Sequence, residues 1–191
     1  MAGQHERARA LIVQSDGSLL VDVHAAGYES TREQLAAFAQ IVKTPEHLHT
    51  YRITPVSLWN AAAAGWSPEE VKEVLREHAR YGVPEGVLAG VDEQMRRFGR
   101  LVLQVDEDEP GALLLSAGDD EAAAVLTSYD SLTAILDPTS DERVFSLDSE
   151  DRGRVKQILA KLGFPVIDCA GYADGAPLPV ELRQVTSAGE P

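Results

Sequence analysis

Three patterns in the sequence predict an α+β fold. The segment 10–23 places two apolar runs around Asp16-Gly17, a pair that tolerates the positive φ angles of a tight turn, so it predicts a β-hairpin. Between residues 54 and 98, capping residues precede stretches with helical apolar spacing. Beyond residue 111, short apolar strands alternate with helical stretches, which predicts a small α/β sandwich.

The hairpin is followed by a predicted helix with one buried face. Ser30 or Thr31 can cap this helix, and it is expected to end before Pro45. Its apolar residues recur three and four positions apart and are Leu35, Phe38, Ile41 and Val42.

Two short helices joined by a tight turn come next. Thr54 and Pro55 suit the N-cap and first position of a helix that stops at Gly65. Ser67-Pro-Glu-Glu70 is a capping box that opens a second helix to about residue 81. The pair therefore predicts a helix-turn-helix.

A third helix over 84–98 leads into an apolar strand over 99–105. Helices followed by a strand indicate a winged-helix-like domain over residues 1–105. The acidic turn 106–111 is the predicted boundary to a small α/β sandwich domain over 106–175, and the Gly- and Pro-rich stretch 176–191 is predicted to be a linker.

The elements predicted for the second domain follow in order along the chain. Its helix over 149–163 is expected to be capped by Ser149, and the segment 132–136 is left without an assignment. The remaining elements are strands over 112–116, 143–147 and 166–170 and a helix over 119–129.

Composition excludes several classes of protein but does not indicate an activity. The chain of 191 residues has a formal net charge of −14, with 11 cations and 13 carboxylates through residue 105 against 6 and 18 beyond it. Such a balance disfavours a protein that holds nucleic acid mainly through phosphates. With no membrane-spanning run and no signal-like start, we expect a cytoplasmic protein. The single Cys169 excludes an internal disulfide and Cys-rich zinc modules.

Three motifs invite a catalytic interpretation, and each has a simpler one. The acidic run 106–109 after an apolar strand is typical of a magnesium-binding box, but no Gly-rich loop with a lysine precedes it, so a solvated turn is favoured. His47 and His49 could share one face of a strand, yet no third metal ligand is evident. Cys169 lies in an apolar strand, where a buried thiol is inert. We predict no catalytic residue, no cofactor-binding residue and no metal ligand in this chain.

Basic residues suggest two candidate contacts for DNA or a partner. Lys72, Arg76 and Arg80 are spaced to form a stripe along the second helix of the helix-turn-helix, but Glu69, Glu73 and Glu77 precede each by three residues and would neutralise it. The second contact lies at the predicted wing, where fewer carboxylates are close in sequence, and consists of Arg96, Arg97 and Arg100.

Trp59 and Trp66 flank the alanine run 61–64 between the two short helices. Large aromatic side chains are mostly buried, so we expect both to pack in the core.

The segment 46–65, EHLHTYRITPVSLWNAAAAG, closely resembles the N-terminal domain region of bacterial XPB-type DNA repair helicases. The resemblance continues in order along nearly the whole chain. Further similar segments are 11–16, 98–101, 151–157, 162–165 and 170–175.

The resemblance implies an ATP-dependent superfamily 2 helicase that unwinds DNA in the 3′ to 5′ direction during nucleotide excision repair. ATP and magnesium are implied only for motor domains, whose motifs match no position here. The chain would then be a non-catalytic accessory region that positions the motor on DNA. Implied partners are the helicase's own motor domains, a repair protein such as a nuclease, and DNA, bound weakly or through the full-length protein. The alternative is a stand-alone winged-helix DNA-binding or transcription-regulatory protein.

Overall fold

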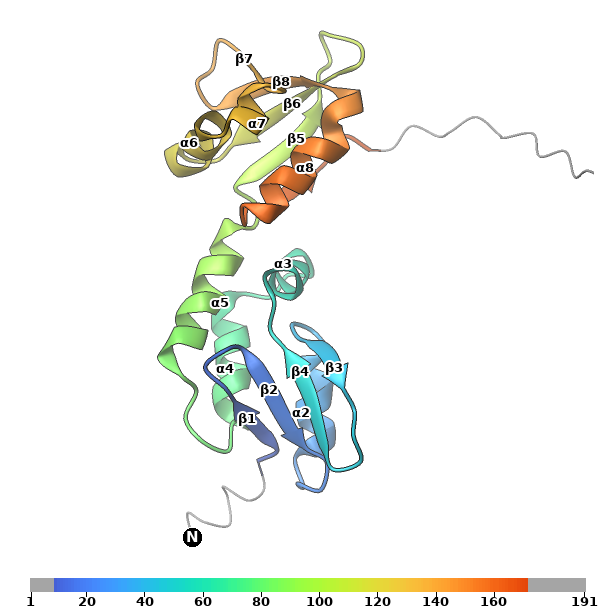
Figure 1. The fold of residues 1–191 in the computed structure, drawn as a ribbon, viewed down its shortest axis with the longest axis vertical. Coiled ribbons are helices and arrows are strands. Elements are labelled where there is room, and N and C mark those ends of the chain that lie inside the picture. The colour runs from blue at the N-terminus through green and yellow to red at the C-terminus, as the bar shows by residue number, and fades with distance from the viewer. Residues whose placement is uncertain (1–8, 172–191) are drawn as a thin grey trace, which may run out of the picture.

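The computed structural model describes residues 9–171 and has the predicted α+β architecture. Two sheets and seven α-helices occur within these residues (Figure 1). The sheets lie at opposite ends of the molecule, and each has its own cluster of buried apolar side chains. No helix in this part of the chain is long and apolar enough to cross a membrane.

The first sheet is antiparallel and has the strand order β1-β2-β4-β3. The predicted hairpin is confirmed, because Leu11 pairs with Val21 and Gly17 turns the chain with a φ of 78°. The strands are β1 (Leu11–Val13), β2 (Ser18–Asp22), β3 (Gln40–Lys43) and β4 (Leu48–Arg52).

The helix predicted after the hairpin is wrong in its second half. Helix α2 spans Tyr28–Leu35, so Ser30 and Thr31 lie inside it, and the prediction that either caps it is wrong because the N-cap is Gly27. The Thr31 hydroxyl donates to the Gly27 carbonyl. Ile41 and Val42 lie instead in β3, where they are 58% and 53% exposed. Such β-branched side chains suit a strand, and backbone pairing with β4 outweighs the helical spacing.

Both predicted capping motifs are confirmed. The Thr54 side chain accepts a hydrogen bond from the Ser57 amide, and the Ser67 side chain accepts one from the Glu70 amide. These motifs open helices α3 (Pro55–Ala63) and α4 (Pro68–His78), and the third predicted helix is α5 (Glu85–Arg97).

Helix α4 ends earlier than predicted. After His78 the backbone becomes extended, and Ala79 forms an isolated parallel bridge with Leu11. The Arg80 amide then donates to the Leu11 carbonyl at 2.6 Å. Arg80 therefore lies beyond the helix, and the prediction that it continues a helical stripe is wrong.

Both tryptophans pack in the interior of the first half, as predicted. Trp59 is buried and its indole N–H donates to the Gln94 carbonyl of α5 at 3.1 Å. This hydrogen bond ties α3 to α5. Trp66 is partly buried against the core of the first sheet and packs on Phe38, with ring centroids 6.0 Å apart.

The second sheet has the order β7-β8-β6-β5-β9, and only the β5–β9 pair is parallel. Its β5 is the strand predicted to close the first domain as a wing. That assignment is wrong, because β5 pairs with β6 and β9. The strands are β5 (Leu101–Val105), β6 (Ala112–Ala117), β7 (Asp137–Pro138), β8 (Val144–Asp148) and β9 (Val166–Asp168).

Three helices and one 3₁₀ turn accompany this sheet. Asp119 caps the first helix by accepting from the Ala122 amide. The prediction that Ser149 caps the helix after β8 is wrong, because the Asp148 side chain accepts a hydrogen bond from the Glu150 amide and Ser149 begins the 3₁₀ turn. The elements are α6 (Asp120–Ser128), α7 (Asp130–Thr133), η1 (Ser149–Asp151) and α8 (Arg152–Lys161). The predicted linker 176–191 lies outside the described residues.

Candidate nucleic-acid interface

The three arginines predicted to contact DNA or a partner gather where α5 meets the second sheet. Arg96 and Arg97 end α5, and Arg100 follows the turn at Gly99, whose φ is 85°. An open hollow of about 360 Å³ brings all three together with the carboxylates of Asp92, Glu93 and Glu121.

Each of these arginines has a carboxylate partner. Arg97 bonds to Glu93 at 2.6 Å, and Arg96 lies 3.8 Å from Asp92 while its side chain stays 68% exposed. Arg100 contacts two carboxylates, which belong to Asp119 at 3.2 Å and Glu121 at 2.6 Å. Arg96 is thus the member of the cluster most available to a phosphate.

Arg97 also joins the two halves of the molecule. Its guanidinium lies over the Phe164 ring, 5.1 Å from the centroid. Gly163 has a φ of 84°, and a Cβ added there would stand 2.6 Å from an Arg97 nitrogen. Because a stacked, paired arginine is held in place, this side chain fixes the junction more than it offers a free charge.

The other predicted stripe is not a continuous basic surface. Lys72 bonds to Asp92 at 2.7 Å and to Glu69 at 3.2 Å, and its side chain is only 13% exposed. Arg80 bonds to Asp22 at 2.8 Å and to the Arg9 carbonyl. Arg76 is exposed and forms no ion pair within residues 9–171.

Asp92 connects the two predicted basic clusters, because Lys72 of α4 and Arg96 of α5 both approach its carboxylate. The hydrogen bond to Asp92 raises the pKa of Lys72 above its ordinary value. The hydrogen bond from Arg80 likewise lowers the pKa of Asp22. Lys72 and Arg80 are therefore already paired with carboxylates. The pairing of Lys72 with Glu69 was predicted. The pairings with Asp92 and Asp22 were not, because those residues come from distant segments.

The acidic run 106–109 forms the turn of the β5–β6 hairpin and is largely exposed, as predicted. The Asp106 carboxylate accepts a hydrogen bond from the Asp108 amide, which stabilises the turn. A magnesium box of a nucleotide-binding fold needs a phosphate-cradling loop beside it. Here β5 lies between the antiparallel β6 and the parallel β9, and the acidic run is the turn that joins β5 to β6.

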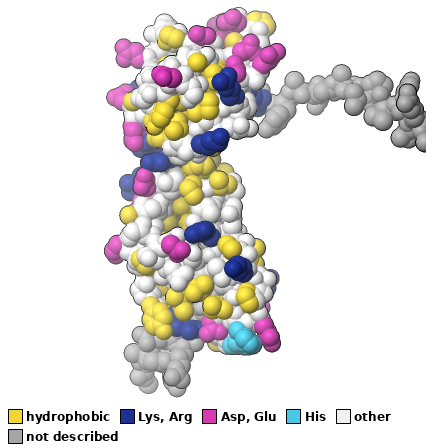
Figure 2. All heavy atoms as spheres, viewed as in Figure 1, with side chains coloured by type: hydrophobic (Ala, Val, Ile, Leu, Met, Phe, Trp, Pro, Cys, Tyr) yellow, Lys and Arg dark blue, Asp and Glu magenta, His cyan; other side chains and the backbone are white. Residues whose placement is uncertain are grey.

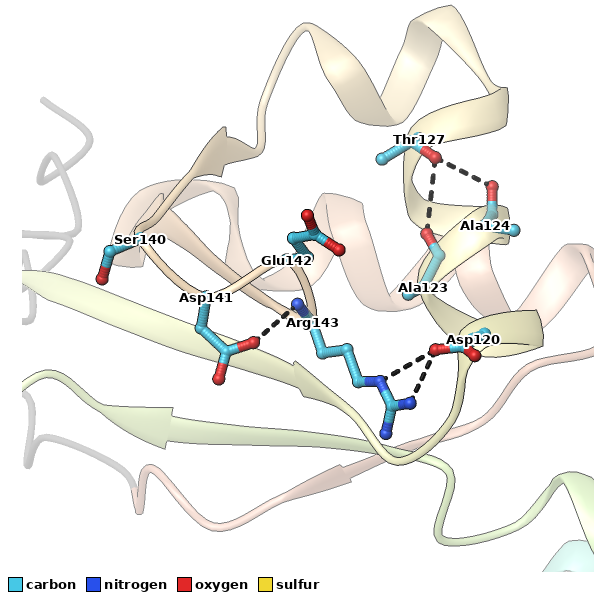
Figure 3. Close-up of a pocket in the computed structure, with 8 residues that line it drawn as sticks. All are labelled: Asp120, Ala123, Ala124, Thr127, Ser140, Asp141, Glu142 and Arg143. Atoms are coloured by element: carbon cyan, nitrogen blue, oxygen red, sulfur yellow. Dashed lines mark hydrogen bonds and ion pairs between the residues drawn. The ribbon is translucent and has the colours of Figure 1, made fainter.

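A second open hollow, of about 860 Å³, lies between α6 and the loop before β8 (Figure 3). Arg143 bonds to Asp120 at 2.6 Å, and its own amide donates to Asp141. Glu142 also lines the hollow. With its arginine paired and further carboxylates around it, this surface repels phosphate.

His47 and His49 have different hydrogen-bond partners, and Cys169 is not buried. His49 bonds to the Tyr28 hydroxyl at 2.9 Å, whereas His47 contacts His24 at 2.8 Å. Cys169 is exposed, so the prediction of a buried thiol is wrong. Strand β9 lies at the edge of its sheet and ends at Asp168, which leaves the next side chain in solvent.

Sequence reasoning missed an ion cluster around Asp168. Its carboxylate accepts from Arg152 at 2.7 Å and from Lys156 at 2.6 Å. Burial raises the pKa of Asp168, but these hydrogen bonds outweigh it and hold the pKa below the ordinary 3.8. The i, i+4 spacing of Arg152 and Lys156 was a visible signal, although their partner lies on a different element.

Comparison with known proteins identifies this chain as a helicase domain. Residues 11–138 match the family described as Helicase conserved C-terminal domain, and the chain belongs to that family.

The relatives are XPB helicases, which confirms the resemblance of residues 46–65 to that family. The chain is 43% identical over 174 residues to the DNA 3'-5' helicase XPB of Kineococcus radiotolerans, covering 91% of this chain and 31% of that protein. It is 40% identical over 174 residues to the XPB helicase of Mycobacterium tuberculosis, with the same coverage. The general transcription and DNA repair factor IIH subunit XPB of Antonospora locustae is 26% identical over 185 residues, covering 93% of this chain and 26% of that protein. The chain thus spans about a third of the length of its bacterial relatives.

Proposed function

We propose that this chain is a non-catalytic accessory region of an XPB-like ATP-dependent 3′ to 5′ DNA helicase of nucleotide excision repair. We place it at the N-terminal end of that helicase, although the family model that it matches is described as a helicase C-terminal domain. The observation that carries the proposal is the identity of 40–43% to bacterial XPB helicases over 91% of the chain. Its role would be to position the motor on DNA and to dock partner proteins, in the cytoplasm.

The acidic turn supports an accessory role over a motor role. The four lysines of the chain are Lys43, Lys72, Lys156 and Lys161, and none follows a glycine as a phosphate-binding loop requires. The β5–β6 hairpin places the acidic run 106–109 at an exposed turn, away from any such loop in the described residues. ATP and magnesium would act in the motor domains of the helicase.

We further propose that the first half is a winged-helix-like domain, without β5 as its wing, and that the second half is a small α/β sandwich. The capped helix pair α3 and α4 beside the β1–β2 hairpin supports the former. The separate apolar cluster of the second sheet supports the latter. The strand β5 now belongs with the second domain.

Charge pairing favours a protein partner over DNA as the main ligand. Lys72, Arg97 and Arg100 are each bonded to a carboxylate, so few cations are left for phosphates. An acidic second half would instead suit a basic surface, including that of a helicase motor.

Two measurements test the accessory role. The purified chain, incubated with ATP and DNA, is expected to release no phosphate, and turnover would overturn the proposal. In the Kineococcus helicase, exchanging the matching segment for this chain should preserve DNA unwinding, whereas deleting the segment should reduce unwinding more than ATP hydrolysis. Equal unwinding with and without the segment would contradict a positioning role.

The alternative, a stand-alone DNA-binding protein, is supported by the exposed side chains of Arg76 and Arg96. It predicts that the isolated chain binds duplex DNA at moderate salt and that changing Arg96, Arg97 and Arg100 to Ala weakens this binding. Absence of binding even at low salt would exclude it.

A further inference from the structure

Two exposed imidazoles meet at one end of the first sheet. His24 follows β2 and His47 precedes β4, and the His24 Nε2 atom lies 2.8 Å from the His47 Nδ1 atom. The Val23 amide donates to the His47 carbonyl at 3.1 Å, which holds the two segments in register. Figure 2 shows histidine at one end of the molecule, bordered by acidic side chains.

We propose that His24 and His47 form a binding site for a divalent late transition metal ion, Cu²⁺ or Ni²⁺. Imidazole nitrogens bind such ions at about 2.0 Å. Two nitrogens in adjacent positions of a square-planar ion are then about 2.8 Å apart, and this geometry is characteristic of Cu²⁺ and Ni²⁺. The observed separation matches that spacing, and it is also the length of the hydrogen bond that joins the two rings, so each ring must rotate to aim its nitrogen at the ion.

Binding requires a small change within the pair. One of the facing nitrogens carries the hydrogen of their mutual bond, and it must present a lone pair to the metal. That hydrogen moves through solvent to the other nitrogen of the same ring, so two neutral imidazoles bind the ion with no net release of protons. Both side chains are exposed and can turn toward a shared ion.

The remaining positions on the metal would be filled by water. The Asp22 carboxylate is occupied by the His24 amide and by Arg80. Groups of three or more metal-ligating side chains are absent from residues 9–171. A closed structural zinc site, which needs four protein ligands, is therefore not what this pair builds. The net charge of −14 favours a cation.

Titration calorimetry with Ni²⁺ and Cu²⁺ tests the site. All proteins carry Cys169→Ser and His5→Gln, so that neither the exposed thiol nor an imidazole outside the described residues contributes. One ion per chain is expected, with Cu²⁺ bound more tightly than Ni²⁺ and no binding of Mg²⁺. Electron paramagnetic resonance of the Cu²⁺ form should report coordination by two nitrogens.

Single substitutions separate this pair from the other histidines. His24→Gln and His47→Gln should each weaken Ni²⁺ binding by at least about tenfold. The matched control is His49→Gln, whose imidazole bonds to Tyr28 and should be dispensable. Circular dichroism checks that each variant is folded. Unchanged binding in the first two variants, or equal loss in the control, would overturn the proposal.

Discussion

Asp168 shows how one carboxylate organises its surroundings. It is 11% exposed and receives hydrogen bonds from two cations of α8, so the strand that carries it is tied to that helix. Breaking a partly buried ion pair costs more stability than breaking an exposed one.

We predict that Asp168→Asn lowers the free energy of unfolding by about 2 kcal/mol at neutral pH, because charged hydrogen bonds to Arg152 and Lys156 are lost. Since the pKa of Asp168 is lowered below 3.8 in the fold, its contribution is present above that pH and is lost as pH falls through the folded-state value. Urea denaturation of both proteins, at neutral pH and at pH values from above 3.8 downward, measures the effect of the substitution and the effect of pH. The control is Asp137→Asn, an exposed residue of β7, and an equal loss in both variants would contradict the prediction.

Gly163 is a residue at which a side chain would be poorly accepted. We predict that Gly163→Ala destabilises the protein by about 1–2 kcal/mol, because its φ is 84° and the new Cβ would meet Arg97. The control, Gly153→Ala in α8, has open space around it and should be neutral or stabilising. Thermal unfolding compares the two, and similar midpoints would refute the argument.

At the scale of elements, two local signals predicted helix starts, whereas the caps predicted at Ser149 and at Ser30 or Thr31 were wrong. The caps at Thr54 and Ser67 fixed the starts of α3 and α4 correctly, since a cap and its partner lie within three residues. The strand β5 was predicted, but the sheet to which it belongs was not, and β3 was missed, because the pairing partners that define them are not adjacent signals in the sequence. In the same way Glu69 was predicted as a partner of Lys72, whereas its partner Asp92 and the partners of Arg100 were found only in the structure.

The capping box of α4 provides a test at this scale. We expect Ser67→Ala to cost about 1 kcal/mol, because the Glu70 amide loses its acceptor and the Glu70 carboxylate loses the Ser67 hydroxyl. Ser128→Ala is the control, since that hydroxyl only bonds to a carbonyl within its own helix. Chemical denaturation with equal midpoints for the two variants would count against the capping argument.

At the scale of the whole molecule, two apolar clusters are formed by separate sheets. Leu19 lies in the first and Leu115 in the second, and both are fully buried. The chain passes between them through α5 and the turn at Gly99.

We predict that Leu115→Ala, which costs about 2–5 kcal/mol of local stability, weakens hydrogen-exchange protection in the second sheet and leaves the first largely protected. Leu19→Ala is the reciprocal variant and should do the opposite. Mass spectrometry of exchange maps both. Loss of protection in both sheets from either variant would show that they unfold as one unit.

Helix α5 also sets the orientation of the second sheet relative to the first. It has 13 residues, which corresponds to a rise of about 20 Å along its axis. Adding a single residue would turn the second sheet by about 100° and advance it by about 1.5 Å, whereas adding about seven would nearly restore the original bearing. A ligand that contacts both sheets at once would therefore lose more affinity from an insertion that rotates the second sheet than from a longer insertion that returns it to its original orientation.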